Sequence, residues 1–329
     1  MKIAVDAMGG DYAPEVVING AVLAVKEYDL DVVLVGDKPA IEKLLARNKY
    51  TSGRIDILHT TEVIEMDEPP ALSVRRKRDS SIVKGMELVK KRQADAFFSA
   101  GNTGAVACAA SLSLGLLPGI ERPGIAIVVP NLQGISIVID VGANIDPKPS
   151  HLVQYGIMAD VYSKYILKKT NPSVGLLNIG EEESKGTDFM KETHALFEQS
   201  HLNFIGNVEG KDLFSGKCDC IVCDGFVGNV ALKVSESLAE TMMVFLKREI
   251  MSNFLGKLGA MLLRRSFRRF KKKVDYAEYG AAPLLGLNGV VMIGHGRSNA
   301  KAVKNAIRFA AEEVRHSVNE KILEEMKRA

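Results

Sequence analysis

The chain of 329 residues is long enough for one large α/β domain or two fused lobes. Hydrophobic residues make up 47% of the chain and charged residues 25%, which excludes a disordered or low-complexity protein. The net charge is +3, from 43 basic and 40 acidic residues, and no recognised nucleic-acid motif is present, so we expect no nucleic-acid partner.

Apolar runs of β type alternate with helical patterns along the chain. Strands are expected at 2–5, 31–35, 54–59, 94–99, 124–130, 135–141, 174–179, 203–205, 219–223 and 290–294. Helices are expected at 14–27, 40–47, 82–92, 103–116, 151–168, 188–200, 230–251 and 299–326. This alternation predicts a three-layer α/β/α fold whose mostly parallel sheet has helices on both faces. No linker rich in Pro, Gly or Ser divides the chain, so residues 1–329 are expected to form one two-lobed unit.

The N-terminus begins almost directly with a strand pattern, Ile3-Ala4-Val5, and lacks the cationic and apolar regions of a secretory signal. The longest apolar stretch, 104–117, is too short and too polar for a spanning helix. We therefore expect a cytoplasmic protein with reduced cysteines.

Three of the four cysteines are clustered as Cys218, Cys220 and Cys223. A metal site needs four ligands with suitable spacing, and neither Cys108 nor a histidine is close in the sequence. We expect no metal here and interpret these thiols as small buried strand residues.

Five short loops rich in glycine follow predicted strands. They cover residues 6–11, 99–105, 140–144, 178–186 and 224–229. In open parallel sheets, ligands bind beyond the carboxyl ends of the strands. Amide groups at loops and helix starts also carry partial positive charge. The sequence therefore predicts a common rim for an anion such as phosphate.

The loops do not have the spacing of a dinucleotide fingerprint, a Walker A loop or a serine-hydrolase elbow. Two of their residues are candidates for oxyanion and phosphate chemistry. Lys185 could hold phosphate as a point charge, or it is simply a solvated loop lysine. Asn229 could donate to an oxyanion, or it is the N-cap of the helix expected from Val230.

One segment carries a charge that differs from the rest of the chain. Residues 256–273 contain eight basic side chains and no acid, whereas the remainder has 35 basic and 40 acidic residues. Two apolar stripes in this region, 254–262 and 263–274, have helical spacing but point in roughly opposite directions, so we predict a break near 262–265. The segment suits either an anionic membrane or acidic protein, or a helical hairpin that packs on a twin subunit, and these interpretations can coexist.

Several strings together resemble the bacterial acyl-[acyl-carrier-protein]:phosphate acyltransferase family of phospholipid synthesis. The matching strings are residues 3–11, 99–105, 140–144, 151–155, 203–209 and 224–230. The resemblance implies a fold like that of phosphate acetyltransferases and isopropylmalate-type dehydrogenases. It further implies a homodimer without metal or redox cofactor at the cytoplasmic face of the membrane.

The reaction implied by the resemblance converts long-chain acyl carrier protein and inorganic phosphate into acyl phosphate, which a membrane glycerol-3-phosphate acyltransferase consumes. We assign catalysis to Lys185 and Asn229. The expected phosphate pocket consists of Gly101, Asn102, Thr103, Asp140, Asn144 and Gly228. The expected contacts with carrier protein or membrane are Leu258, Leu262, Arg264, Arg265, Phe267, Arg268 and Arg269.

Two further features stay open. The basic run Arg75-Arg76-Lys77-Arg78 faces the carrier protein, faces the phosphate rim, or is a solvated turn, and His295 is a candidate base that phosphate chemistry does not require. The rival functions are a phosphate acetyltransferase that uses a coenzyme A thioester and a non-catalytic scaffold at the membrane.

Overall fold

The computed structural model describes residues 1–274 and 280–328, and these residues build one sheet of eleven strands. The strand order is β3-β2-β1-β4-β11-β10-β5-β6-β9-β7-β8. The strands are β1 (Lys2–Asp6), β2 (Asp31–Gly36), β3 (Ile55–His59), β4 (Ala96–Ser99), β5 (Gly124–Asn131), β6 (Gly134–Ile139), β7 (Val174–Leu177), β8 (Phe204–Val208), β9 (Cys220–Val222), β10 (Ala282–Leu285) and β11 (Val290–Ile293).

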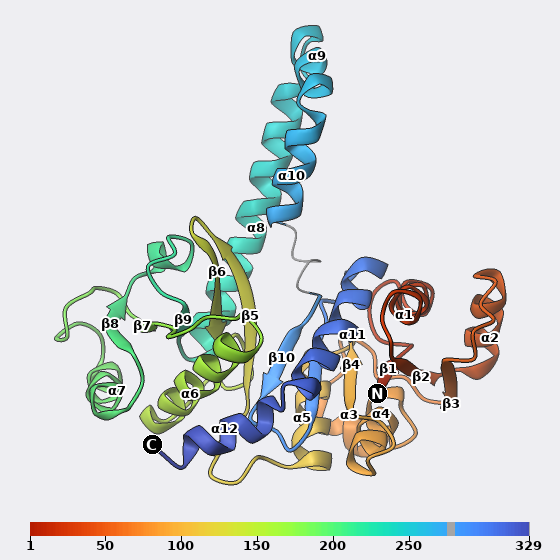
Figure 1. The fold of residues 1–329 in the computed structure, drawn as a ribbon, viewed down its shortest axis with the longest axis horizontal. Helices are drawn as coiled ribbons and strands as arrows, with labels where there is room; N and C mark the ends of the chain where they lie inside the picture. The colour runs from red at the N-terminus through yellow and green to blue at the C-terminus, as the bar shows by residue number, and fades with distance from the viewer. Residues whose placement is uncertain (275–279, 329) are drawn as a thin grey trace.

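Helices cover both faces of the sheet, which confirms the predicted α/β/α fold (Figure 1). They are α1 (Glu15–Glu27), α2 (Lys38–Arg47), α3 (Pro70–Arg76), α4 (Ser81–Lys90), α5 (Thr103–Leu114), α6 (Pro149–Tyr165), α7 (Asp188–Gln199), α8 (Gly225–Ile250), α9 (Phe254–Leu262), α10 (Arg264–Val274), α11 (Ala300–Arg315) and α12 (Val318–Met326). A short 3-10 helix covers Gly210–Leu213. No helix in the described part of the chain is long and apolar enough to cross a bilayer.

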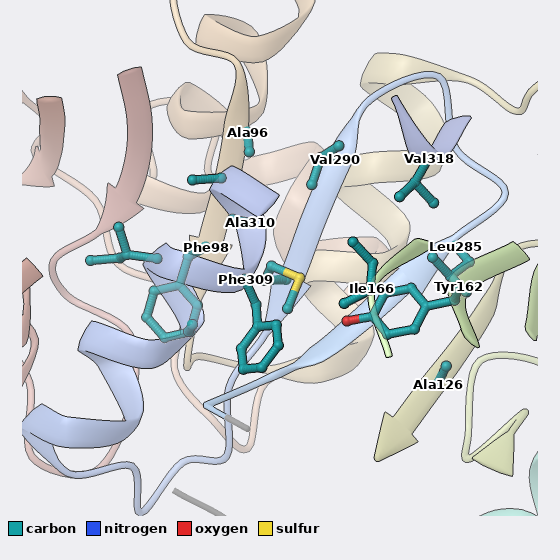
Figure 2. Close-up of a cluster of buried hydrophobic side chains, with 14 of the residues drawn as sticks. Ala96, Phe98, Ala126, Tyr162, Ile166, Leu285, Val290, Phe309, Ala310 and Val318 are labelled. Atoms are coloured by element: carbon teal, nitrogen blue, oxygen red, sulfur yellow. The ribbon is translucent and has the colours of Figure 1, made fainter. Parts of the chain in front are cut away.

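Two hydrophobic layers run along the faces of the sheet. One layer joins the strands to α1, α6, α11 and α12, and the other joins them to α3, α4 and α5. Figure 2 shows part of the first layer, where Tyr162 of α6, Phe309 of α11 and Val318 of α12 gather over the strand residues Leu285 and Val290. Each layer contains residues of both β1 and β9, so the packing on each face is continuous across the two halves of the sheet.

The direction of the strands reverses in the middle of the sheet. Strands β3, β2, β1, β4 and β11 are parallel to one another and form the first half. Strands β6, β9, β7 and β8 are also mutually parallel and form the second half. The three pairs between them, β11–β10, β10–β5 and β5–β6, are antiparallel. Three antiparallel pairs in succession give the two halves opposite strand directions, so the carboxyl ends of their strands lie on opposite sides of the sheet. The side where the first-half strands end is called the first-half edge, and the side where the second-half strands end is called the second-half edge.

The single rim expected from the sequence is therefore wrong. The loops after β1 and β4 lie at one edge, and the loops after β6, β7 and β9 lie at the other. The sequence does not predict the antiparallel strand β10, which reverses the strand direction between the two halves. Its residues include Pro283, and proline is unfavourable in a strand because it has no amide N–H to donate.

Two other differences concern helices. The C-terminal helix expected at 299–326 is interrupted at Ser317, which has a left-handed φ of 50°. A glycine at this position would have predicted such a break, whereas a serine does not. The short helix α3 follows Pro69 and begins at Pro70, a position where proline is tolerated because the first amide of a helix needs no partner. The break in the basic segment is confirmed, since α9 ends at Leu262 and α10 begins at Arg264.

A buried carboxyl group in the first core layer makes the stability of the fold depend on pH. Glu313 of α11 is 3% exposed, hydrogen-bonds Tyr162, and leaves its Oε1 without a partner in the described residues. Burial raises the pKa of Glu313 from 4.5 to about 8. Below pH 4.5 the folded and unfolded chains are both protonated at this group, and its contribution is fully present.

Between pH 4.5 and pH 8 the unfolded chain releases this proton while the folded chain retains it, so the free energy of unfolding falls by about 1.4 kcal/mol per pH unit from this group alone. Glu313→Gln, which keeps a partner for Tyr162, should remove that slope in urea unfolding measured at several pH values. Glu312→Gln, one residue away and less buried, is the control. Parallel pH profiles for Glu313→Gln and the parent would contradict the assignment.

Candidate active site

The edge at the carboxyl ends of the first half is organised by the buried carboxylate of Asp6. Its Oδ2 accepts a hydrogen bond from Ser99 Oγ at 2.7 Å and its Oδ1 accepts from the Met8 amide at 3.0 Å. Burial raises the pKa of Asp6, and these donors oppose the rise. The loops after β1 and β4 approach so closely that a Cβ on Gly9 would lie 2.7 Å from the amide nitrogen of Gly101. This edge is therefore built around glycine backbones.

Helix α5 starts at the same edge. Asn102 caps it by accepting from the Ala105 amide at 3.0 Å, while its Nδ2 donates to the carbonyl oxygens of Met66 at 3.1 Å and Glu68 at 3.0 Å. The side chain of Asn102 is thus fully used inside the protein. Among the described residues, the amides of Thr103 and Gly104 have no hydrogen-bond partner, and Thr103 is exposed. An anion here would meet backbone amides and not the Asn102 side chain.

The edge at the carboxyl ends of the second half is organised by Asp140, which is fully buried. Its Oδ1 accepts from the amides of Ile125 at 3.0 Å, Gly142 at 3.1 Å and Ala143 at 2.9 Å, and its Oδ2 accepts from the Asn144 amide at 2.7 Å. Burial raises the pKa of Asp140, and the four amides oppose that rise. Asp140 fixes the shape of this loop by accepting hydrogen bonds from its amides. The same amides are therefore not available to bind phosphate.

Helix α8 starts against this loop, five residues earlier than the sequence suggested. Its N-cap is Asp224, whose Oδ1 accepts from the amides of Phe226 at 3.0 Å and Val227 at 2.9 Å, and the Gly225 amide donates to Asn144 O at 2.9 Å. A Cβ on Gly228 would lie only 1.9 Å from Asp140 O, so glycine lets the helix touch the loop. The capping role considered for Asn229 is therefore wrong.

Asn229 lies in the second turn of α8 and is exposed. A Cβ on Gly142 would be 3.7 Å from its side-chain amide nitrogen, so the facing loop is close and carries no side chain at that position. The side-chain amide of Asn229 does not cap the helix, so it is available to hydrogen-bond a bound molecule.

Lys185 lies in the loop after β7, at the same edge as Asn229 because β7, β9 and β6 are neighbouring parallel strands. Its amide donates to Glu182 O at 3.0 Å and its carbonyl accepts from Asn178 Nδ2 at 3.1 Å. Gly186 follows with φ of +88°, which closes the turn. The lysine side chain lies across Gly180 and is exposed, so the turn fixes its backbone and leaves the ammonium accessible.

The structure thus divides the residues expected in one site into two groups. Asp140, Asn144, Gly228, Asn229 and Lys185 share the second-half edge, whereas Gly101, Asn102 and Thr103 share the first-half edge.

Helix α8 connects the two edges. Asn229 lies near its start, and Glu240, eleven residues further along, forms an ion pair at 2.7 Å with Arg297 in the segment after β11. Eleven residues of helix span about 16 Å, which gives the scale of the separation.

The basic segment projects away from the sheet as α9 and α10, at the far end of α8 (Figure 1). No residue of α9 is buried, and Leu258 and Leu262 are 40% and 76% exposed. Arg264, Arg265 and Arg269 are exposed and Phe267 is half-buried. The side chains of Arg268 and of residues 271–274 lie outside the described residues.

Two contacts near the second-half edge escaped the sequence reading. His151 is buried, accepts the Lys148 amide on Nδ1 at 3.0 Å and faces Glu121 Oε2 through Nε2 at 3.0 Å. The hydrogen bond from His151 lowers the pKa of Glu121. Asn144 Nδ2 reaches the buried Tyr155 hydroxyl at 3.4 Å. These residues anchor α6 beside the Asp140 loop, and only the string 151–155 hinted at them.

Cys218, Cys220 and Cys223 cluster around β9 and are buried. Burial raises the pKa of Cys218 to about 12 and also raises the pKa values of Cys220 and Cys223. These groups therefore stay protonated thiols at neutral pH and are poor nucleophiles.

Comparison with known proteins gives consistent likenesses over the full length. A model of the family described as fatty acid synthesis protein matches residues 1–321. The phosphate acyltransferase of Dictyoglomus turgidum is 52% identical over 326 residues, which cover 98% of this chain and 97% of that protein. The phosphate acyltransferase of Geobacter sulfurreducens is 50% identical over 326 residues, which cover 99% of this chain and 94% of that protein.

Solved structures share the fold at low sequence identity. A phosphotransacetylase from Streptococcus pyogenes superposes with a TM-score of 0.67 at 18% identity and covers 95% of this chain and 94% of its own. The EutD phosphotransacetylase from Staphylococcus aureus gives a TM-score of 0.64 at 15% identity with the same coverage of 95% and 94%.

Proposed function

The chain belongs to the family of fatty acid synthesis proteins that includes phosphate acyltransferases, and we propose that it moves a long-chain acyl group from acyl carrier protein to inorganic phosphate. The observation that carries the proposal is the 52% identity, over nearly the whole of both chains, to a phosphate acyltransferase. The product is an acyl phosphate, which supplies phospholipid synthesis through a membrane glycerol-3-phosphate acyltransferase.

The chemistry needs little from the protein beyond position and charge. Phosphate is ionised at neutral pH, so one of its oxygens can attack the thioester carbonyl without a strong base. A C–O bond forms, a tetrahedral oxyanion develops, and the C–S bond then breaks as the thiolate of the carrier leaves. Catalysis consists of holding phosphate in line and stabilising the oxyanion.

Lys185 and Asn229 are the residues proposed for these two tasks. The exposed ammonium of Lys185 balances the charge of the incoming phosphate, and the amide of Asn229 donates to the oxyanion. Asn144 and Gly228 shape the pocket between them, and Asp140 acts through the loop it holds. Gly101, Asn102 and Thr103 follow β4, at the carboxyl ends of the first half of the sheet.

Lys185→Ala and Asn229→Ala should each lower kcat about 10²–10³-fold, the usual loss for one oxyanion donor. Acyl phosphate formed from acyl carrier protein and phosphate is the readout. Both residues are exposed, so thermal melts should match the parent. Lys191→Ala, an exposed lysine on α7, is the control. Turnover near the parental rate in both variants would remove these assignments.

The same assay separates the rival functions. Product from acetyl-coenzyme A but not from acyl carrier protein would favour a phosphate acetyltransferase. No product from either thioester would favour a scaffold.

A homodimer is proposed because α8 carries a long exposed apolar stripe, the α8 seam. Val234, Leu238 and Phe245 are 60%, 59% and 58% exposed although they follow helical spacing along one side of α8. Val227, Val230 and Met242 complete the seam. Apolar surface of this extent marks an interaction site, and a second copy offers a matching surface. Asn229 lies on the opposite side of α8, so such a dimer leaves it accessible.

Leu238→Glu should shift the protein from dimer to monomer in sedimentation at micromolar concentration, because a buried carboxylate without a partner is costly. Lys247→Glu lies on the opposite side of α8 and should leave the mass unchanged. A parental mass for Leu238→Glu would argue against the seam as the interface.

Peripheral membrane binding is proposed for the tip of the projection, which would place the enzyme at the inner face of the cell membrane. Phe254, Leu255, Leu258, Met261 and Leu262 share one face of α9 and are all exposed. Arg264, Arg265 and Arg269 follow, so an apolar face stands beside cationic groups that suit anionic headgroups. The same arginines can steer the acidic carrier protein, while Phe267 adds to the lipid contact.

Leu258→Glu and Leu262→Glu should weaken flotation with phosphatidylglycerol vesicles more than tenfold, since each inserted leucine contributes about 1.5–3 kcal/mol. Leu112→Glu, an exposed leucine on α5 that is 60% exposed, serves as the control. If both tip variants float like the parent, lipid does not contact α9.

A further inference from the structure

A pocket of about 500 Å³ lies between the loop after β7, helix α7 and the edge strand β8. It is separate from the residues proposed for acyl transfer, although it borders the loop that carries Lys185. Its lining residues are Glu181, Glu183, His194, Phe197, Glu198, Leu202, Phe204, Ile205 and Gly206. The lining combines apolar side chains with carboxylates, so it fits a ligand that has both an apolar part and a charged part.

The floor of the pocket is aromatic. Phe197 and Phe204 are stacked with ring centroids 4.9 Å apart, and the ring of His194 meets Phe204 edge-on at 5.1 Å. Leu202 packs beside them. Phe197 is fully buried against Phe204, so the apolar surface that a ligand can reach consists of half-buried Phe204 and Leu202 and exposed Ile205. Such a surface suits an aliphatic chain, and the ring of Phe204 can also attract a cation.

Three carboxylates surround this floor, and they differ in how far they are already neutralised. Glu181 is paired with Lys211 at 3.4 Å and with Lys217 at 3.2 Å. Glu198 approaches only His194 Nδ1, at 3.9 Å, and is exposed. Glu183 is exposed and makes no ion pair with the described residues. Glu183 and Glu198 therefore leave negative charge for a ligand.

His194 provides an independent sign of a ligand. Its side chain is only 7% exposed, yet its Nε2 has no hydrogen-bond partner in the described part of the chain. Nδ1 lies 3.9 Å from Glu198 Oε2, and in the tautomer that carries the proton on Nδ1 the lone pair of Nε2 is free to accept. The backbone of Gly206, where φ is +88°, is close to this nitrogen, since a Cβ there would lie 4.0 Å from Nε2.

We propose that this pocket binds an organic cation, a protonated primary amine carried on an aliphatic chain. The ammonium group donates to His194 Nε2, and the carboxylates of Glu183 and Glu198 balance its charge. The chain attached to it lies against Phe204 and Leu202. Neither an anion nor a neutral chain satisfies both the carboxylates and the buried imidazole.

Calorimetric titration of the full-length protein with n-hexylamine, n-hexanol and hexanoate tests the proposal, since the three probes share a chain length and differ in charge. Hexylamine should bind at least about tenfold more tightly than hexanol, and hexanoate should not bind, because hydrogen bonds to charged groups supply the difference. Equal affinities for hexylamine and hexanol, or no binding of hexylamine at about 10 mM, would overturn the proposal.

Variants locate the site. Glu183→Gln combined with Glu198→Gln should weaken hexylamine binding at least about tenfold, and His194→Phe should weaken it several-fold while it keeps the aromatic contact with Phe204. Glu192→Gln removes an exposed carboxylate from the same helix outside the pocket and should leave the affinity unchanged. If the double variant binds hexylamine like the parent, the amine binds elsewhere and the assignment is wrong. Thermal melts of each variant establish that the fold is intact.

Discussion

The carboxylate of Asp140 is the interaction from which the candidate site and the projection both extend. A buried carboxylate is costly unless its oxygens are satisfied, and four backbone amides satisfy this one. Those bonds fix the loop after β6, and the loop in turn receives the Gly225 amide and so sets where α8 begins. These amides are already bonded to Asp140, so the proposed phosphate site relies on side chains that project beyond the loop.

Helix α8 carries three of the proposed functional surfaces at different places along its length. Its first turns present Asn229 beside the Asp140 loop, its middle carries the α8 seam, and its far end leads to α9 and α10 (Figure 1). Because helical periodicity separates faces, Asn229 and the seam point in opposite directions. The surfaces proposed for chemistry, self-association and lipid contact therefore do not overlap on this one helix.

The antiparallel strands at the centre of the sheet determine where the strand-end loops lie. They send the carboxyl ends of the two halves to opposite edges and give each edge its own buried aspartate, Asp6 in the first half and Asp140 in the second. Each aspartate ties its loops through backbone amides, and glycines such as Gly9 and Gly228 let neighbouring segments come into contact. Two similar edges result, and only the second carries Lys185 and Asn229.

The sequence by itself determined the α/β class, most of the strands and helices, the break near Leu262 and the family, because these depend on local periodicity and on continuous strings of residues. It could not show that the glycine loops occupy two edges, because strand direction depends on pairing across the sheet and β10 carries a misleading proline. It also misjudged Asn229, because Asp224 and Asn229 are both good caps and only packing against the Asp140 loop selects Asp224. Tertiary structure decided which of the similar loops face one another, since that choice depends on contacts between residues far apart in the chain.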